Sequence, residues 1–152
     1  MIIFKNKGFT LVELMIVIAI VGILTGIAIP TLQPYMAQRR LNGAARMVMS
    51  DLMNARMMAV SQNKRVGVSF TSNHQYQIFA DNNQNGTADT GETIVTKDIH
   101  PDYYDVTLSS NTTPLFVPAG TVLTATNGTV TLTSAIGSKQ VTTSSAGRVR
   151  IS

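Results

Sequence analysis

The chain has 152 residues, of which 44% are hydrophobic, 13% are charged and none is cysteine. This composition excludes a disulfide-stapled miniprotein and a highly charged disordered chain, and it leaves enough residues for one modest hydrophobic core. The formal net charge is +4, but Lys5 and Lys7 lie in the N-terminal leader, so the rest of the chain carries only +2 and a nucleic-acid site requires a local basic patch.

The first predicted element is an apolar stretch that ends at Ile29 and contains no charged side chain from Leu14 onward. It follows a basic leader that ends at Gly8, and Glu13 is the only ionisable side chain between Phe9 and Ile29. As a helix this segment is roughly 30 Å long, about the thickness of a bilayer's hydrocarbon core. The basic flank predicts a single-pass helix with a cytoplasmic N-terminus. A cleaved signal peptide fits poorly because its small residues follow the apolar core, and a plain signal anchor leaves the carboxylate unexplained.

The string KGFTLVELMIVIAIVGIL resembles the N-terminus of a type IV prepilin. In that family a dedicated prepilin peptidase cuts after the glycine and methylates the new terminal residue. The resemblance therefore implies cleavage between Gly8 and Phe9 and an N-methylated Phe9. Glu13 then takes the fifth mature position, at which the family's carboxylate is thought to neutralise the terminal amine of a neighbouring subunit during assembly. The physics agrees, because opposite charges in apolar surroundings are tolerated as a pair.

A second helical pattern follows Pro30 and Pro34, and we expect these prolines to kink the helix or loosen a turn without ending it. An apolar stripe with spacings of three and four predicts an amphipathic helix from about Thr31 to Ser61, continuous or nearly so with the apolar segment. Five methionines widen this face, and we expect them to pack against a sheet. The stripe consists of Leu41, Ala45, Val48, Leu52, Ala55 and Ala59, and the methionines are Met47, Met49, Met53, Met57 and Met58.

After Ser61 short runs rich in β-forming residues replace the helical period. Asn127-Gly128 predicts a two-residue hairpin between the runs on either side of it. The pattern predicts an α+β fold, in which a long N-terminal helix packs on an antiparallel β-sheet domain. The predicted division is a leader at 1–8, a transmembrane or filament-core helix at 9–29, an amphipathic helix at 30–63 and a periplasmic β domain at 64–152. The predicted strands lie at 65–70, 76–80, 93–99, 105–109, 115–117, 122–126, 129–133, 140–143 and 149–151.

This layout resembles the GspH/FimT group of minor type IV pilins and pseudopilins over the whole chain. Further local likenesses are SDLMNARMMAVSQNKRV in the helix, LFVPAG at 115–120 and the terminal GRVRI. The resemblance implies a subunit that waits in the inner membrane with its β domain in the periplasm and then enters a filament with other pilin or pseudopilin subunits. Two functions stay open. One is a subunit that binds double-stranded DNA for uptake in competence. The other is a structural pseudopilin of a type II secretion system, or an assembly and priming subunit of a motility pilus.

A polar stretch from Asp81 to Glu92 reads DNNQNGTADTGE and fits the calcium-loop pattern D-x-[DN]-x-[DN]-G-x5-E. Gly86 permits the sharp turn of such a loop, although the flanking runs are strands and not the helices of an EF-hand. Asn and Asp also populate ordinary turns, so a plain polar hairpin loop is the alternative. With three carboxylates, a calcium site is expected to be weak. The donors would be the side chains of Asp81, Asn83, Asn85, Asp89 (directly or through water) and Glu92, and the carbonyl of Thr87.

At the C-terminus Gly147-Arg148-Val149-Arg150 matches a G-R-x-R motif, which the resemblance links to DNA binding in the DNA-uptake members of the group. In a strand, Arg148 and Arg150 point to the same face about 7 Å apart, on the scale of the phosphates along one DNA strand. Lys139 is near in sequence and would extend the patch. The alternative is a solvated edge strand whose arginines prevent edge pairing.

The sequence predicts no enzyme. His74 and His100 stand alone, without a cysteine or a carboxylate at a ligand spacing, and we interpret them as surface or turn histidines. No glycine-rich phosphate loop is present, and no serine or threonine stands beside a base in a recognisable catalytic arrangement.

Overall fold

The computed structural model of the protein describes residues 8–123 and 128–152, without the side chains of residues 28–31. In these residues one helix, α1 (Leu11–Gln62), precedes eight strands. The chain divides into two compact units, the first ending at Met36 and the second spanning Ala37–Ser152, and each is described by itself. The predicted boundaries at 8/9, 29/30 and 63/64 stay predictions.

The first unit holds the apolar part of α1. The large apolar side chains between Phe9 and Ile27 are all 49% or more exposed, so the described part of this unit has no core of its own. No single helix in the described residues meets the length and hydropathy criteria for a membrane span, but Leu11–Ile27 and Leu32–Gln62 meet them together, by length and composition. An apolar surface of this extent requires a non-aqueous neighbour, either lipid or other protein chains.

The rest of α1 confirms the predicted amphipathic helix, which neither Pro30 nor Pro34 ends. Each of the six residues of the predicted stripe is buried, with at most 2% of its surface exposed. The prediction that all five methionines pack in the core is wrong for Met53 and Met57, which are exposed. At about 100° per residue, Met53 and Met57 lie on one flank of the stripe, whereas Met47 and Met58 lie on the opposite flank. The three methionines that do pack against the core are Met47, Met49 and Met58.

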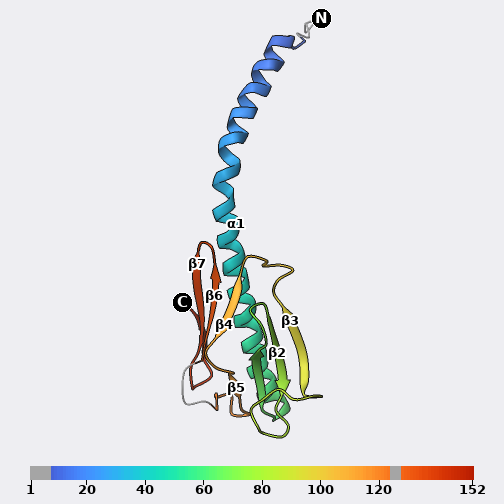
Figure 1. The fold of residues 1–152 in the computed structure, drawn as a ribbon, viewed down its shortest axis with the longest axis vertical. Coiled ribbons are helices and arrows are strands. Elements are labelled where there is room, and N and C mark those ends of the chain that lie inside the picture. The colour runs from blue at the N-terminus through green and yellow to red at the C-terminus, as the bar shows by residue number, and fades with distance from the viewer. Residues whose placement is uncertain (1–7, 124–127) are drawn as a thin grey trace, which may run out of the picture. The chain divides into compact units, whose positions relative to one another are not determined.

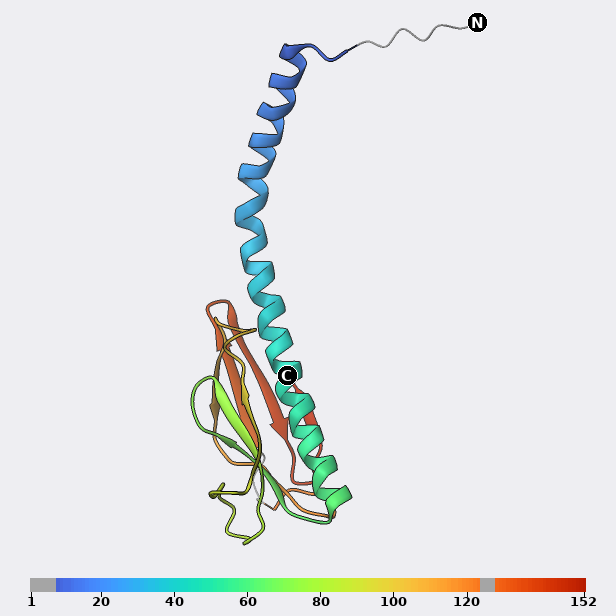
Figure 2. The ribbon, with the colours of Figure 1, turned by 90° about the vertical axis from the view of Figure 1, so that its right-hand side faces the viewer.

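The strands form two four-stranded antiparallel sheets, which confirms the α+β class. The first sheet has the order β3-β2-β1-β5 and the second has the order β4-β6-β7-β8. Figures 1 and 2 show both sheets beside the second half of α1. The strands are β1 (Val66–Phe70), β2 (Gln75–Ala80), β3 (Thr93–Asp98), β4 (Thr107–Ser110), β5 (Leu115–Phe116), β6 (Gly128–Ser134), β7 (Gly137–Thr143) and β8 (Val149–Ile151).

Eight of the nine predicted strands are present, and the run 122–126 is the exception. Val122 forms only an isolated bridge with Phe116, and residues 124–126 lie outside the described residues, as does Asn127 of the predicted hairpin. The predicted hairpin therefore lies mostly outside the described residues; among the described strands, β4 and β7 are the neighbours of β6. The tight hairpin instead joins β6 to β7, where Ser134 lies opposite Gly137.

The core lies between the buried stripe of α1 and residues of both sheets. Two polar contacts fix the helix against this core. The buried hydroxyl of Tyr76 on β2 donates a hydrogen bond of 2.5 Å to the carboxylate of Asp51. Burial is the main cause that raises the pKa of Tyr76, and this hydrogen bond is the second cause. Nearer the start of the unit, the guanidinium of Arg40 makes two hydrogen bonds of 2.7 and 2.8 Å to Asp105 and lies 4.7 Å from the ring centroid of Tyr104.

Candidate functional site

The C-terminal strand β8 is an edge strand that pairs with β7, with Thr142 opposite Arg150. Val149 is 7% exposed and joins the core, whereas Arg148 and Arg150 are exposed. This alternation confirms that the two arginines share the outer face of the strand. Within the part of the chain that the structure describes, neither guanidinium forms a hydrogen bond or an ion pair. Both cations are therefore available to an external anion.

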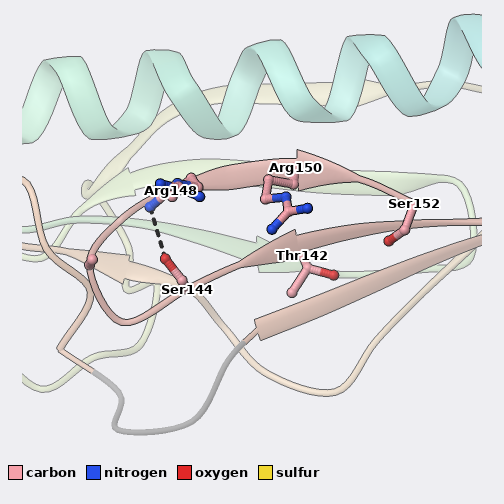
Figure 3. Close-up of a pocket in the computed structure, with 6 residues that line it drawn as sticks. Thr142, Ser144, Arg148, Arg150 and Ser152 are labelled. Carbon is pink, nitrogen blue, oxygen red and sulfur yellow. Dashed lines mark hydrogen bonds between the residues drawn. The ribbon is translucent and has the colours of Figure 1, made fainter.

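The two arginines line a shallow groove of about 440 Å³ beside β7. Figure 3 shows Arg148 at the entrance to β8 and Arg150 within the strand, with Ser144 and Thr142 near them. The backbone N–H of Arg148 donates to the hydroxyl of Ser144 at 3.2 Å, which ties the strand to the end of β7. None of the residues that line the groove is acidic, so it offers cations and hydroxyl donors to phosphate oxygens. The lining residues are Thr142, Ser144, Ala146, Arg148, Arg150 and Ser152.

Gly147 has a structural reason to be a glycine. Its φ of 75° lies in the left-handed region, and a Cβ there would lie 2.0 Å from the carbonyl oxygen of Gly120. The same carbonyl accepts a hydrogen bond of 2.7 Å from Nε of Arg56 on α1. This contact has no signal in the sequence, because nothing in LFVPAG indicates that Gly120 meets Arg56 or Gly147. The first residue of G-R-x-R therefore packs inside the protein and positions the strand that carries the arginines.

Lys139 does not extend the arginine surface, and that part of the prediction is wrong. It lies opposite Leu132 in the β6–β7 register, and Leu132 is buried in the core. Lys139 also shares its side of β7 with Val141, which alternates with the outward-facing Thr142. The lysine is thus on the opposite face of the sheet from Arg150.

At the other end of the chain, Gly8 and Phe9 precede α1 and are exposed, and Thr10 caps the helix. The carboxylate of Glu13 accepts hydrogen bonds of 2.9 Å from both the backbone N–H and the hydroxyl of Thr10. The hydroxyl oxygen of Thr10 accepts one of 3.2 Å from the N–H of Glu13. This reciprocal pair is a capping box, which the sequence analysis missed although T-x-x-E is its usual signal. It gives Glu13 a partner within its own chain.

The six predicted calcium ligands lie in one loop between β2 and β3. The carboxylate of Asp89 accepts hydrogen bonds from the side-chain amides of Asn83 at 2.7 Å and Asn85 at 2.6 Å. Both bonds lower the pKa of Asp89, and the bond from Asn83 has the larger effect. Gly86 has a φ of 76°, as the predicted sharp turn requires. Among the described residues, no three His, Asp or Glu side chains are arranged to hold a metal ion.

The two histidines lie in turns, as predicted, but they do not stand alone in space. His74 follows β1 and His100 follows β3, and their rings meet edge to face with centroids 4.9 Å apart. Asp98 accepts hydrogen bonds from the backbone N–H of His100 at 2.8 Å and from the amide of Gln75 at 2.9 Å. The sequence spacing could not show this, because antiparallel pairing of β2 with β3 brings the two turns together.

Comparison with known proteins supports one family. Residues 44–147 match the family described as "Type II transport protein GspH", and residues 3–29 match the "Prokaryotic N-terminal methylation motif". The "Pilin-like protein PilA1" of Thermus thermophilus is 33% identical over 155 residues, covering 96% of this chain and 98% of its own. A "Fimbrial protein" of Pseudomonas aeruginosa is 47% identical over 74 residues, 48% of this chain and 47% of its own.

Two solved structures share the fold. The type IV minor pilin FimU of Pseudomonas aeruginosa aligns with a TM-score of 0.62 and 18% identity, over 78% of this chain and 92% of its own. The minor pseudopilin EpsH of the Type 2 Secretion System of Vibrio cholerae aligns with a TM-score of 0.56 and 12% identity, over 74% and 96%. Together with the matched motif and the matched domain, these likenesses confirm the predicted family: the chain belongs to the GspH family of type IV minor pilins and pseudopilins and carries a prepilin-type N-terminal methylation motif.

Proposed function

We propose that this protein is a minor filament subunit that binds duplex DNA without sequence preference through Arg148 and Arg150. The observation that supports the DNA-binding part is the pair of exposed cations on one face of β8, neither of them engaged by another described residue. They line a groove whose other lining residues contribute hydroxyl and methyl groups and no acidic side chain.

The assembly part of the proposal concerns the N-terminal unit. Cleavage after Gly8 would place the new amine on Phe9, one residue before the capping Thr10. The exposed apolar side chains from Phe9 to Ile27 would lie in the inner membrane, with the N-terminus cytoplasmic, until they pack against other pilin or pseudopilin subunits. In that apolar setting the carboxylate of Glu13 and the amine of a neighbouring subunit would each stabilise the other.

A second function competes with DNA binding, and one observation favours it. Strand β8 is at the edge of its sheet. Exposed arginines on an edge strand prevent unwanted pairing with another chain. On this alternative the protein is a structural subunit of a secretion pseudopilus or of a motility pilus, and its arginines have no ligand.

Titration of a fluorescent DNA duplex with the full-length protein in a non-ionic detergent separates the two. With two phosphate contacts we expect weak, roughly micromolar affinity that falls about tenfold for a fourfold rise in salt, and no difference between unrelated sequences. Arg148→Gln with Arg150→Gln should abolish binding without lowering the melting temperature, because both side chains are exposed.

The matched control is Lys97→Gln with Lys139→Gln, which removes the same charge from other surfaces and should retain binding. Unchanged binding by the arginine variant would place the DNA contact on another surface. Equal losses in both variants would show that net charge and not the β8 face attracts DNA. No binding by the parent protein at low salt would leave the structural subunit as the function.

A further inference from the structure

The loop Asp81–Glu92 is closed at its base by backbone hydrogen bonds. The N–H of Ala80 donates to the carbonyl of Glu92 at 2.9 Å, and the N–H of Asp81 donates to the carbonyl of Arg65 at 3.0 Å. The first and last acidic residues of the loop therefore lie beside one another, although eleven positions separate them in sequence. This closure brings the backbones of the two residues together at the base of the loop.

Asp81 is the residue that the fold leaves unsatisfied. It is 2% exposed, and its Oδ1 accepts a hydrogen bond of 3.2 Å from the N–H of Gly86, so the carboxylate is directed into the loop. Its Oδ2 is buried and has no hydrogen-bond partner. A buried charged oxygen without a partner is costly, so native proteins almost always satisfy it with a donor, an ordered water or a cation.

Among the described residues, no side-chain cation contacts this oxygen. Lys64 and Arg65 line a surface hollow together with Asp81, but neither is within ion-pairing distance of it among the described residues. The guanidinium of Arg65 instead donates to the carbonyl oxygen of Gln84 at 3.4 Å. The charge of Asp81 is thus available to a ligand that enters from solvent.

Glu92 provides a second carboxylate inside the same loop. It is 8% exposed, and its Oε1 accepts hydrogen bonds from the N–H groups of Asn82 at 2.9 Å and Asn83 at 3.3 Å. Its Oε2 accepts one of 3.3 Å from the N–H of Asp89. Three backbone donors hold this carboxylate inside the loop.

We propose that this loop is a calcium site, in which the unsatisfied oxygen of Asp81 is the first ligand. The side-chain oxygens of Asn83 and Asn85 and the carbonyl of Thr87 would add neutral donors, Asp89 would act directly or through water, and Glu92 would complete the shell. A donor set of oxygens with two neutral amides suits Ca²⁺, which accepts six to eight oxygens in a flexible geometry, better than Mg²⁺, which demands a near-ideal octahedron. With three carboxylates the affinity belongs in the range of extracellular modules, about 10⁻⁴ to 10⁻³ M.

Binding requires a rearrangement of the loop. The amide nitrogens of Asn83 and Asn85 now face Asp89, and Glu92 is held by backbone donors. No three acidic groups converge among the described residues. Calcium would exchange these internal hydrogen bonds for ligand bonds and join the end of β2 to the start of β3. The ion would therefore stabilise the β2–β3 hairpin, independently of whether the arginine face binds DNA.

The test is calorimetric titration of the full-length, detergent-solubilised protein with calcium chloride, together with melting curves in millimolar calcium, in magnesium and in excess EGTA. We expect one Ca²⁺ per chain and a rise in melting temperature of about 5 °C at ten times the dissociation constant, with little effect of Mg²⁺. Asp81→Asn and Glu92→Gln should each abolish the heat and the shift. Asp102→Asn, which removes an exposed carboxylate outside the loop, should retain both.

The parent protein alone decides the question if a variant fails to fold. No heat and no calcium-dependent shift in the parent would show that water satisfies Asp81 and that the loop is a plain polar turn. Calcium binding that survives unchanged in a folded Asp81→Asn or Glu92→Gln variant would place the ion elsewhere and overturn the proposal.

Discussion

Replacement of Gly147 by alanine should be among the most destabilising single-methyl changes in the protein, and the structure allows its cost to be divided. The left-handed backbone at this position, with φ of 75°, costs a residue with a side chain about 1–2 kcal/mol. The added Cβ would also lie 2.0 Å from the carbonyl oxygen of Gly120 and 3.0 Å from Nε of Arg56. Because the nearest atom belongs to the backbone, no side chain can turn away to relieve the contact.

Gly91 is the matched control for the backbone term. Its φ is 88°, close to that of Gly147, but no atom lies within 4 Å of the position that a Cβ would take. Gly91→Ala should therefore lower the free energy of unfolding by about 1–2 kcal/mol. Gly147→Ala should add an overpacking cost of about 1–3 kcal/mol, for a total of about 2–5 kcal/mol. A difference of 2 kcal/mol between the variants corresponds to roughly 6–10 °C in melting temperature for a folded unit of this size.

The assay is thermal or urea unfolding of the full-length protein in detergent, followed by circular dichroism, with EGTA present so that the loop of Gly91 binds no ion. The expected order of stability is parent, then Gly91→Ala, then Gly147→Ala. Equal losses in the two variants would refute the reasoning, because they would mean that the contact with Gly120 is relieved without cost and that only the backbone conformation matters.

Two further predictions concern single side chains. Glu13→Gln keeps a side-chain oxygen for the capping hydrogen bonds with Thr10 but removes the charge. It should therefore reduce entry into filaments as much as Glu13→Ala does, and the mature chain should still begin at methylated Phe9. Normal filament entry by the glutamine variant would mean that Glu13 acts only as a helix cap. The hydrogen bonds from Arg40 lower the pKa of Asp105 in the folded protein, so the unfolded chain binds a proton at this residue more readily than the folded chain does. The stability that this group contributes is therefore present above the ordinary Asp pKa near 4 and is lost as the pH falls below it. Asp105→Asn should flatten the fall in melting temperature below about pH 5, and an unchanged slope would assign the acid sensitivity to other carboxylates.

The helix was predictable because its signals are local. The stripe at spacings of three and four identified six of the seven α1 residues in the buried core cluster and left out Ala44, since burial on one face is what the period encodes. The pattern failed where burial depends on a partner from elsewhere in the chain. Asp51 lies outside the predicted stripe, yet it is buried and accepts a hydrogen bond from the hydroxyl of Tyr76 on β2.

The sheets were harder to predict than their strands. Each strand has its own composition signal, but pairing is decided by which edges are still available, and Asn127-Gly128 carries no information about that. The same limit applies to the surfaces. Lys139 seemed to belong with Arg150 because both are near in sequence, whereas the register of β7 places them on opposite faces.

The fold separates residues that stability explains from residues that it does not. In the G-R-x-R segment, Gly147 is required by its contact with Gly120 and Val149 belongs to the core, so both would be retained in a protein that never meets DNA. The same holds for Glu13, whose hydrogen bonds cap its own helix whether or not a neighbour's amine approaches. A match to the whole motif therefore overstates the evidence for a function. Packing does not explain the positive charge at Arg148 and Arg150. Substitutions that change only this charge should therefore remove the proposed DNA binding and leave the fold intact.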